Sequence, residues 1–225
     1  TKLDIKGLGK AKYILKEGGT LGDLYTTSDL RFNDNGYVEV DKNGNLLMTD
    51  EGEDIYLGSV FPNHNLAWRN DFSYKGINLG ILFTARLGGV CYSATQANLD
   101  LYGVSEASAA ARDAGGVLIN GREMVDAQKW YQAIGSQSGL PQYYLYSATN
   151  VRLQELSLGY TFPRKWFRDK MGLTVSFVGR NLWMVYCKAP FDPEAVASTG
   201  LNYQGIDYFM MPSMRNLGFN VKFQF

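Results

Sequence analysis

The sequence lacks several features that define whole classes of protein. It contains no run of about 18 apolar residues, so no transmembrane helix is expected, although the alternating strands of a membrane β-barrel are not excluded. Its 22 basic residues balance 22 acidic ones, which counts against a nucleic-acid partner, because such proteins carry a clustered basic excess. The two cysteines, Cys91 and Cys187, are far apart and define no disulfide framework, so they are interpreted as small apolar residues.

Histidine is nearly absent, which narrows the chemistry that the chain can perform. His64 is the one histidine, and it lies at the start of an expected strand without a partner motif, which favours a structural or solvent-facing role. The GLGK segment at 7–10 lacks the third glycine of a dinucleotide fingerprint and the spacing of a P-loop. The sequence shows no recognisable combination of acid, base and nucleophile, so we expect neither enzyme activity nor a cofactor.

Two acidic segments resemble metal sites only in part. DKNGN at 41–45 is similar to the opening of a calcium loop, but Leu46 stands where that loop needs glycine and Gly52 where it needs glutamate. The turn chemistry of asparagine and glycine predicts a simple turn there. EGED at 51–54 is interpreted as a solvated loop, with a divalent cation as the second choice. We therefore expect no metal site.

The most informative feature that is present is strict alternation at the C-terminus. Every second residue from Leu217 to Phe225 is apolar, and the residues between them are polar or glycine. Period two predicts a strand with one apolar face and one polar face. The aromatic content of 14% and the 25 glycines agree with a chain rich in strands and turns.

The same alternation predicts five strands, near 64–75, 77–88, 150–162, 172–185 and 214–225. Each has about the 9–11 residues that a tilted strand needs to cross a bilayer, or slightly more. The residues expected to face lipid are Ile77, Leu79, Ile81, Phe83, Leu156, Leu158, Tyr160, Leu173, Val175 and Phe177. The opposite face suits a watery lumen and carries Gly80, Arg86, Arg152 and Lys222.

The connections between these strands alternate between short and long. Lys75-Gly76 predicts a tight hairpin turn and residues 163–171 a short link, whereas 89–149 and 186–213 are long. This rhythm is typical of outer-membrane barrels, with short periplasmic turns and long outer loops. Within 89–149, SEASAAARD predicts a helix capped by Ser105 and stopped at Gly115-Gly116, and GREMVDAQKWYQAIG predicts a second helix. Residues 16–60 are polar and turn-rich, with a small hairpin around YVEV.

Aromatic residues gather near the expected strand ends. The default interpretation is an interfacial girdle, comprising Trp68, Tyr143, Tyr144, Tyr146, Tyr160, Trp166, Phe167, Trp183 and Tyr186. Three rings in the long connection, Trp130, Tyr143 and Tyr144, could instead bind a ligand by stacking on sugars. The sequence leaves both interpretations open for these three residues.

Four blocks resemble the SusC/RagA-like family of TonB-dependent outer-membrane transporters of Bacteroidetes. GSVFPNHNLAWRNDFSYKGINLGILF is similar to the family's F-x-Y-K-G hairpin, and ATNVRLQELSLGYTFPRKW resembles its R-L…L-G-Y strand, with Asn150-Val151 departing at the start. GRNLWMVYCKAPFDPE resembles its N-L…D-P-E strand and loop, and MMPSMRNLGFNVKFQF its closing strand. The blocks occur in family order over 58–225, and the first 57 residues fit more loosely.

The resemblance implies an all-β fold, in which this chain is the last five strands of an antiparallel transmembrane β-barrel of about 22 strands with long extracellular loops. Residues 1–60 would form an external loop and hairpin region, residues 61–225 barrel strands and loops, and the plug domain would be absent. The closing alternation also resembles the signal that the barrel-assembly machinery recognises, carried by Phe219, Val221, Phe223 and Phe225.

The family further implies a function for the chain. It would be the C-terminal section of an importer in the Gram-negative outer membrane, in contact with lipid and with a SusD-like surface lipoprotein. Cargo would be an oligosaccharide or a peptide, and TonB would act through the N-terminal part of the family's proteins. The alternative is a soluble or surface-bound β-rich module for glycan binding or adhesion, which would pack its alternating faces into two sheets.

Overall fold

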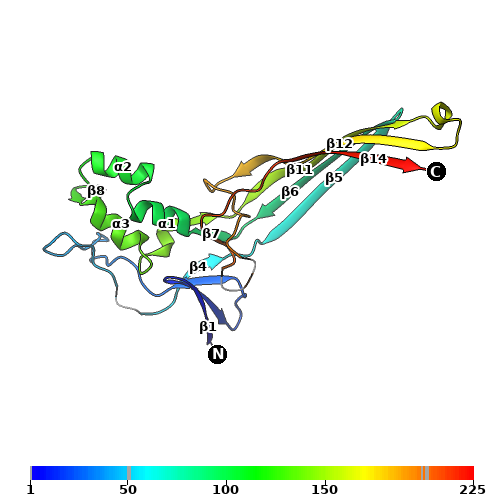
Figure 1. Cartoon of the computed structure of the whole chain (residues 1–225). Helices are drawn as coiled ribbons and strands as arrows, with labels where there is room; N and C mark the ends of the chain where they lie inside the picture. Colours follow the sequence, from blue (N-terminus) through cyan, green and yellow to red (C-terminus); the bar gives the residue numbers. More distant parts are fainter. Residues whose placement is uncertain (1, 50–51, 199, 201–202) are drawn as a thin grey trace. The chain divides into compact units, whose positions relative to one another are not determined.

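The computed structural model of the protein describes residues 2–49, 52–198, 200 and 203–225 and divides into two compact units. The core unit comprises Thr1–Phe61, Gly89–Ser147 and Ala195–Met210, and the sheet unit comprises Pro62–Gly88, Ala148–Glu194 and Met211–Phe225. The described residues include no helix that is both long and apolar enough to span a membrane. Figure 1 labels the elements of both units.

The sheet unit is built from five long antiparallel strands in the order β14-β12-β11-β6-β5 (Figure 1). They are β5 (His64–Tyr74), β6 (Ile77–Leu87), β11 (Asn150–Phe162), β12 (Gly172–Cys187) and β14 (Asn216–Gln224). All five match the strands predicted from period-two alternation to within about two residues at each end. The antiparallel prediction is confirmed for this sheet, and closure into a barrel stays a prediction.

The two short connections in the sheet unit also agree with the sequence. Lys75 and Gly76 both have positive φ, 48° and 87°, which is the geometry of a type I′ turn between Tyr74 and Ile77. A Cβ at position 76 would lie 2.7 Å from the carbonyl oxygen of Thr161, so glycine is required there for space as well as for φ. The second link contains the short 3₁₀-helix η2 (Arg164–Phe167).

The core unit contains three small sheets. A four-stranded sheet has the order β1-β2-β3-β4, a three-stranded sheet has the order β10-β7-β13, and β8 pairs with β9. Their bounds are β1 (Lys2–Leu8), β2 (Ala11–Lys16), β3 (Asp23–Thr26), β4 (Ile55–Ser59), β7 (Val90–Ser93), β8 (Val117–Ile119), β9 (Glu123–Val125), β10 (Leu145–Ser147) and β13 (Ile206–Asp207). Alternation had predicted none of these strands, which are 2 to 7 residues long and therefore show too few periods to be recognised.

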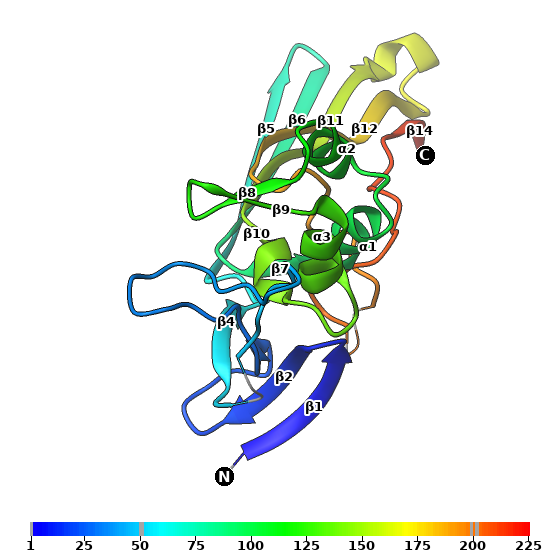
Figure 2. The ribbon, with the colours of Figure 1, turned by 90° about the vertical axis from the view of Figure 1, so that its left-hand side faces the viewer.

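Three helices and the 3₁₀-helix η1 (Pro141–Tyr144) complete the core unit, where the helices gather beside one another in Figure 2. Helix α2 (Glu106–Asp113) is capped by Ser105 and followed by Gly115 at φ 82°, as predicted. Helix α3 (Ala127–Gly135) begins at its cap Asp126, later than predicted, because Glu123–Val125 forms β9. Helix α1 (Ala94–Leu101), capped by Ser93, was not predicted.

The hydrophobic core of the described residues lies within the core unit. Distant segments supply it, among them Tyr13 of β2, Leu30 after β3, Leu140 before η1 and Ile206 of β13. All four side chains are almost completely buried. The long connections of the sequence are therefore not free loops, because they share one packed interior.

The polar stretch 29–49 folds back on itself twice. Phe32 bridges to Val38 and Val40 to Leu46, so the predicted hairpin around YVEV is continued by a second turn. In that turn Asp41 Oδ1 accepts hydrogen bonds from the backbone N–H groups of Asn43 and Asn45, the turn chemistry expected for DKNGN. Hydrogen bonds from Asn45 lower the pKa of Asp41.

The second acidic segment, EGED, is only partly described. Glu51 lies outside the described residues, and Asp54 forms ion pairs with Lys2 at 2.8 Å and Lys16 at 2.9 Å. These cations satisfy the Asp54 carboxylate and, through hydrogen bonds from Lys2 and Lys16, lower its pKa. Among the described residues, no group of three or more potential metal ligands is present.

Candidate functional site

The five long strands place their apolar side chains in register on one face of the sheet. One row across the sheet is Phe72, Leu79, Leu158, Phe177 and Phe219, joined by direct strand pairing at each step. The rings of Phe177 and Phe219 approach edge-on, with centroids 5.5 Å apart. Directly opposed residues project from the same face, so the predicted apolar alternation forms one continuous surface.

The neighbouring row continues this surface toward the hairpin turn. It consists of Tyr74, Ile77, Tyr160, Val175 and Val221, again paired strand to strand. The members of both rows are mostly solvent-exposed in the sheet unit, and Phe219 reaches 81%. An ordered apolar face of this extent marks contact with a partner or a membrane.

The opposite face of the same strands is polar. Ser73 donates a hydrogen bond to Asn78 at 2.8 Å, and Asn78 donates to Thr161 at 2.8 Å. The hydroxyl of Thr161 in turn lies 3.1 Å from that of Thr174. The chain of contacts crosses β5, β6, β11 and β12, so the polar side chains are joined across the sheet in the same way as the apolar ones.

Charged residues of the polar face form a second network. Glu155 of β11 receives a hydrogen bond from Arg180 at 2.9 Å and lies 3.8 Å from Arg69. Arg69 also pairs with Asp71 at 2.9 Å. Two cations and two anions thus alternate across the sheet, which suits a hydrated surface where exposed ion pairs are readily formed and exchanged.

A β-bulge at Gln154 keeps the two faces separate. Leu153 pairs with Phe83 but Glu155 pairs with Leu82, so Gln154 is an extra residue in β11. The apolar positions of β11 therefore change from odd numbers, Val151 and Leu153, to even numbers from Leu156 onward while staying on one face. This change of parity was visible in the sequence and would have predicted the bulge.

The sheet unit also contains a buried ion pair at one end of β11. Arg152 Nη2 lies 2.6 Å from Asp192 Oδ1, and the two side chains are only 3% and 7% exposed. Arg152 also donates to Asn150 at 3.2 Å and lies 3.3 Å from Glu194 Oε2. Its Nη1 is 3.4 Å from Oδ1 of Asn181, a residue with φ of 53°. We call this cluster the loop anchor.

The loop anchor joins sequence motifs that are far apart. Arg152 belongs to the R-L…L-G-Y block, whereas Asn181 lies near the start and Asp192 and Glu194 at the end of the N-L…D-P-E block. Asp192 Oδ2 also accepts hydrogen bonds from Ser213, at 2.7 Å from its hydroxyl and 3.2 Å from its backbone nitrogen. The sequence placed Arg152 on the lumen face but gave no sign of its partner, 40 residues away.

The protonation state of Asp192 is set by this surrounding. Burial acts to raise the pKa of Asp192, but hydrogen bonds from Arg152, Ser213 and the backbone N–H of Glu194 outweigh it and hold the pKa at about 2. The carboxylate is therefore ionised over the physiological range. An ionised, buried carboxylate paired with arginine fixes the loop that carries it to the strand.

Aromatic rings lie in the middle and at one end of the apolar face. Near the middle of β5, Trp68 lies against Phe83 of β6, with ring centroids 5.9 Å apart. At the end of β11, Phe162 contacts Tyr160 at 5.0 Å and Trp166 at 5.7 Å. Strands of 11 residues, such as β5 and β6, span about 36 Å, or roughly 25–30 Å when tilted as in a barrel, which matches an apolar band. The girdle stays a prediction.

The three rings named as possible ligand platforms differ in their positions. Trp130 and Tyr143 form an edge-to-face pair with centroids 6.1 Å apart, and Tyr143 is 40% exposed. Tyr144 is 3% exposed and belongs to the hydrophobic core, so it offers no ring face to a ligand. Stacking on a sugar therefore stays a prediction for Trp130 and Tyr143 alone.

The remaining residues singled out from the sequence are dispersed. His64 is exposed at the first position of β5, in agreement with a structural or solvent-facing role. Cys91 is buried in the core unit, and Cys187 is half-buried in the sheet unit, where its thiol lies 3.4 Å from the carbonyl oxygen of Ala189. Lys222 lies beside Thr174 on the polar face, as predicted.

Comparison with known proteins connects these features to one class. No family model matches the chain. The TonB-dependent receptor P3 of Formosa agariphila is 26% identical over 198 residues, which cover 83% of this chain and 19% of that protein. The solved structure of the RagAB peptide transporter is similar in fold, with a TM-score of 0.50 and 18% identity over 95% of this chain and 25% of that chain.

A second solved structure agrees with the first. The RagAB peptide importer in its open-open state gives a TM-score of 0.51 and 15% identity, covering 99% of this chain and 27% of that chain. The chain thus shares its fold with part of the RagAB structures. More particularly, the resemblance to SusC/RagA-like TonB-dependent transporters that the four motif blocks indicated is confirmed. The chain spans about a fifth to a quarter of the length of these relatives.

Proposed function

We propose that this chain is the C-terminal section of a TonB-dependent nutrient importer in the Gram-negative outer membrane. In this proposal the five long strands are part of the wall of a closed barrel. The observation that carries it is the strand register, which aligns apolar side chains on one face across all five strands and a hydrogen-bonded polar network on the other face across four of them. A barrel wall needs this arrangement, because one face meets hydrocarbon and the other meets water.

The edges of the sheet support membership in a larger barrel. Within the described residues β5 and β14 each pair on one side only. Unpaired backbone groups are not tolerated in hydrocarbon, where water cannot satisfy them. Further strands would therefore have to pair with both edges. In this proposal residues 61–225 supply barrel strands and loops, residues 1–60 lie outside the membrane, and the plug belongs to another part of the polypeptide.

Individual residues acquire roles under this proposal. Lipid would contact the ten residues predicted for the apolar face, which are Ile77, Leu79, Ile81, Phe83, Leu156, Leu158, Tyr160, Leu173, Val175 and Phe177. On β14, Phe219, Val221 and Phe223 of the same face, together with Phe225, would present the signal read by the barrel-assembly machinery. The ion pairs of Arg69 and Glu155 would line the lumen.

The proposed partners follow from the family. They are a SusD-like surface lipoprotein, TonB acting through the plug region, and a cargo that is an oligosaccharide or a peptide. The RagAB structures are of a peptide transporter, which supports import as the general activity. The balance of basic and acidic residues gives no reason to add a nucleic acid.

The soluble or surface-bound binding module is less well supported. Such a module would bury its apolar sheet face against a second sheet. Instead Leu158, in the middle strand, is 54% exposed, and Ile77 is 50% exposed. A face that stays open along the whole sheet fits lipid better than it fits the interior of a sandwich.

Nitroxide scanning along β12 tests the proposal in the protein at its natural length, reconstituted in lipid vesicles. Single cysteines at Val175, Ser176 and Phe177, in a background with Cys91 and Cys187 replaced by alanine, sample both faces. We expect labels at 175 and 177 to collide with oxygen dissolved in the bilayer, and the label at 176 to collide with a water-soluble nickel chelate. Equal accessibility at the three positions, or a protein that stays out of membranes, would overturn the proposal.

A further inference from the structure

The charges of the chain are divided unequally between the two units. The sheet unit has 12 basic residues and 5 acidic ones, whereas the core unit has 10 basic residues and 17 acidic ones. Five of the basic residues of the sheet unit belong to its two short connections, and we call them the basic turn patch. They are Lys75 in the turn between β5 and β6, and Arg164, Lys165, Arg168 and Lys170 in the link between β11 and β12.

The two short connections lie beside each other at one end of the sheet (Figure 1). The backbone N–H of Thr161, just before the link, donates a hydrogen bond to the carbonyl oxygen of Gly76 at 2.7 Å. The link also reaches toward β14, because a Cβ at Gly172 would lie 3.6 Å from Arg164 Nε and Gly172 pairs with Gln224. The basic turn patch therefore belongs to one end of the sheet and not to two separate places.

Little negative charge neutralises the basic turn patch. Within the described residues, none of its five members takes part in an ion pair. Asp169 is the one acidic residue in the sequence from 163 to 171. All five basic residues are exposed. A concentration of one sign of charge attracts ligands of the opposite sign, so this end of the sheet favours an anionic partner.

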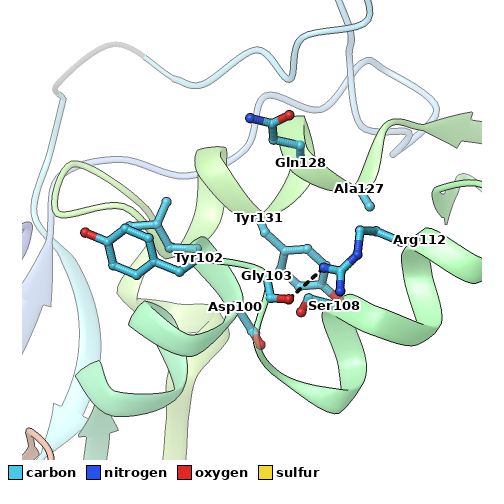
Figure 3. A pocket seen from close by; sticks show the side chains of 9 residues that line it. Asp100, Tyr102, Gly103, Ser108, Arg112, Ala127, Gln128 and Tyr131 are labelled. Carbon is cyan, nitrogen blue, oxygen red and sulfur yellow. Dashed lines mark hydrogen bonds between the residues drawn. The ribbon is translucent and has the colours of Figure 1, made fainter.

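Charged side chains in the core unit offer a contrast, because contacts within the chain already engage them. Figure 3 shows Arg112 beside the pocket between the three helices, where its Nη1 donates to the carbonyl oxygen of Gly103 at 2.8 Å. Asp100, at the same pocket, accepts a hydrogen bond from Gln96 at 2.9 Å. The charges of that pocket therefore give no reason to expect a ligand, whereas those of the basic turn patch do.

The basic turn patch directly borders the apolar face of the sheet. Phe162 ends the apolar alternation of β11, and the ring of Trp166 in the link lies against it with centroids 5.7 Å apart. Trp166 is itself 68% exposed. On the other turn, the ammonium group of Lys75 lies 5.2 Å from the centroid of the Tyr74 ring, which belongs to the apolar face. Exposed indole rings and cations on apolar stems are typical of the boundary between hydrocarbon and headgroups.

We propose that the basic turn patch binds the headgroups of anionic phospholipids at the membrane surface reached by the two short turns. Its cations contact the lipid phosphates, while Trp166 and the apolar face contact the acyl chains of the same lipids. A zwitterionic headgroup is bound less well, because the patch repels its cationic part. The inference rests on the proposed function, since lipid surrounds the sheet only in a membrane. It adds that lipids at this end of the sheet are selected by charge.

A soluble phosphate compound is the less favoured ligand. Exposed cations on two open turns do not enclose a small anion, and single exposed ion pairs contribute little to binding in water. A lipid is held by its acyl chains as well, so each cation acts on a headgroup that is already at the surface. The continuity of the basic turn patch with the apolar face therefore favours lipid over a free anion.

Native mass spectrometry on the protein at its natural length, released from detergent micelles, tests the inference. The probes are phosphatidylglycerol and phosphatidylcholine with identical acyl chains, supplied in equal amounts. One variant neutralises part of the basic turn patch and combines Arg164→Gln, Lys165→Gln and Lys170→Gln. The matched control removes the same charge from the polar face and combines Arg69→Gln, Arg180→Gln and Lys222→Gln. Since each basic residue near an anionic surface contributes about fivefold, the first variant should lower the ratio of bound phosphatidylglycerol to phosphatidylcholine about tenfold or more. The control should bind like the wild type.

Each other outcome overturns the inference. The wild type must retain more phosphatidylglycerol than phosphatidylcholine, and the control must not lose this preference as the first variant does. Glycerophosphoglycerol, the water-soluble headgroup, should not displace the bound lipid, and displacement would identify a site for soluble phosphates instead. If the first variant fails to fold, the wild type still gives a result. Its preference should decrease as the ionic strength rises from about 0.05 M to about 0.5 M, because salt screens exposed charges, and a preference independent of salt contradicts the inference.

The nitroxide experiment separates this inference from the proposed function. If labels at 175 and 177 contact the bilayer but phosphatidylglycerol is not preferred, the basic turn patch alone is rejected. If the preference depends on the patch but the three positions of β12 are equally accessible, the barrel wall alone is rejected. The second result would leave a basic surface that binds anionic lipid from outside the membrane.

Discussion

The core unit and the sheet unit place their large apolar side chains in opposite environments. In the core unit Tyr13, Leu24 and Ile206 are at most 1% exposed, whereas in the sheet unit Phe177 and Phe219 are 40% and 81% exposed. The members of the hydrophobic core all belong to the core unit. One chain therefore uses apolar residues in two ways. In the core unit they hold its own segments together, and in the sheet unit they form an exposed apolar face.

This difference shows what stabilises each unit. The core unit gains from burying apolar surface within itself, about 25 cal/mol for each Å² removed from water. The sheet unit has backbone pairing and polar side-chain networks, and its apolar face gains its energy only when hydrocarbon covers it. The ion pair of Arg152 with Asp192 differs from these exposed contacts, because both side chains are deeply buried.

The largest expected effect comes from removing the buried ion pair of Arg152 and Asp192. Arg152→Met leaves Asp192 buried without its cation, which should cost about 3–5 kcal/mol of unfolding free energy. Arg180→Met is the matched control, since its ion pair with Glu155 is exposed and should contribute less than about 1 kcal/mol. Urea unfolding of the protein in lipid vesicles measures both. Similar losses for the two variants would contradict the distinction between buried and exposed pairs.

The next largest effect compares the two faces of the sheet at two adjacent residues of β11. Leu156→Arg puts a charge on the apolar face of β11 and should cost about 2–4 kcal/mol near the middle of the bilayer. Ser157→Arg puts the same charge on the polar face beside Gly80 and should cost much less. The same unfolding assay in vesicles compares them. A larger penalty at Ser157 would reverse the assigned faces.

The pH dependence of the unfolding free energy tests the loop anchor separately from the rest of the sheet unit. The folded pKa of Asp192, about 2, lies below the ordinary aspartate value of 3.8, so its stabilising contribution is fully present above about pH 4. It is lost as the pH falls from about 4 to 2 and amounts to about 2 kcal/mol. The unfolding free energy of the wild type should therefore fall more than that of Asp192→Asn as the pH is lowered from about 5 to about 2, a range that includes this window. Parallel pH profiles would show that Asp192 is not the titrating group.

The smallest expected effect belongs to the core unit. Ser105 caps α2 by accepting a hydrogen bond from the backbone N–H of Ser108 at 3.0 Å. Ser105→Ala should cost about 1 kcal/mol of local stability. Hydrogen exchange should report faster exchange in α2 and no change in β11 or β12. Faster exchange throughout the sheet unit would mean that the two units do not respond separately.

The sequence predicted the sheet unit well because its strands are long and alternate strictly. Leu217 to Phe225 show the period over enough residues to fix both the strand and its faces, and Lys75-Gly76 specifies its turn by local chemistry. The core unit was harder, because Tyr13, Leu30 and Ile206 meet only through contacts between distant segments. Short strands such as β3 and β13 carry too little periodicity to be recognised.

The candidate sites were predictable to different degrees. The apolar face followed from period two, and the bulge at Gln154 could have been inferred from the change of parity between Leu153 and Leu156. The ion pair of Arg152 and Asp192 could not, because a sequence does not show which charges are buried together. Tyr144 was grouped with its neighbour Tyr143, and only the packing of the core separates them.

The loop anchor has a consequence for how this part of the chain can vary. Asp192, near the start of the long connection after β12, binds Ser213, near its end, as well as Arg152 on the strand. The two ends of the intervening segment are thus tied together at its base, whatever lies between them. Since doubling a closed loop costs only about 0.6 kcal/mol, insertions in this segment that leave β13 and its buried Ile206 in place would change the exposed surface of the protein without shifting the strand register of the sheet.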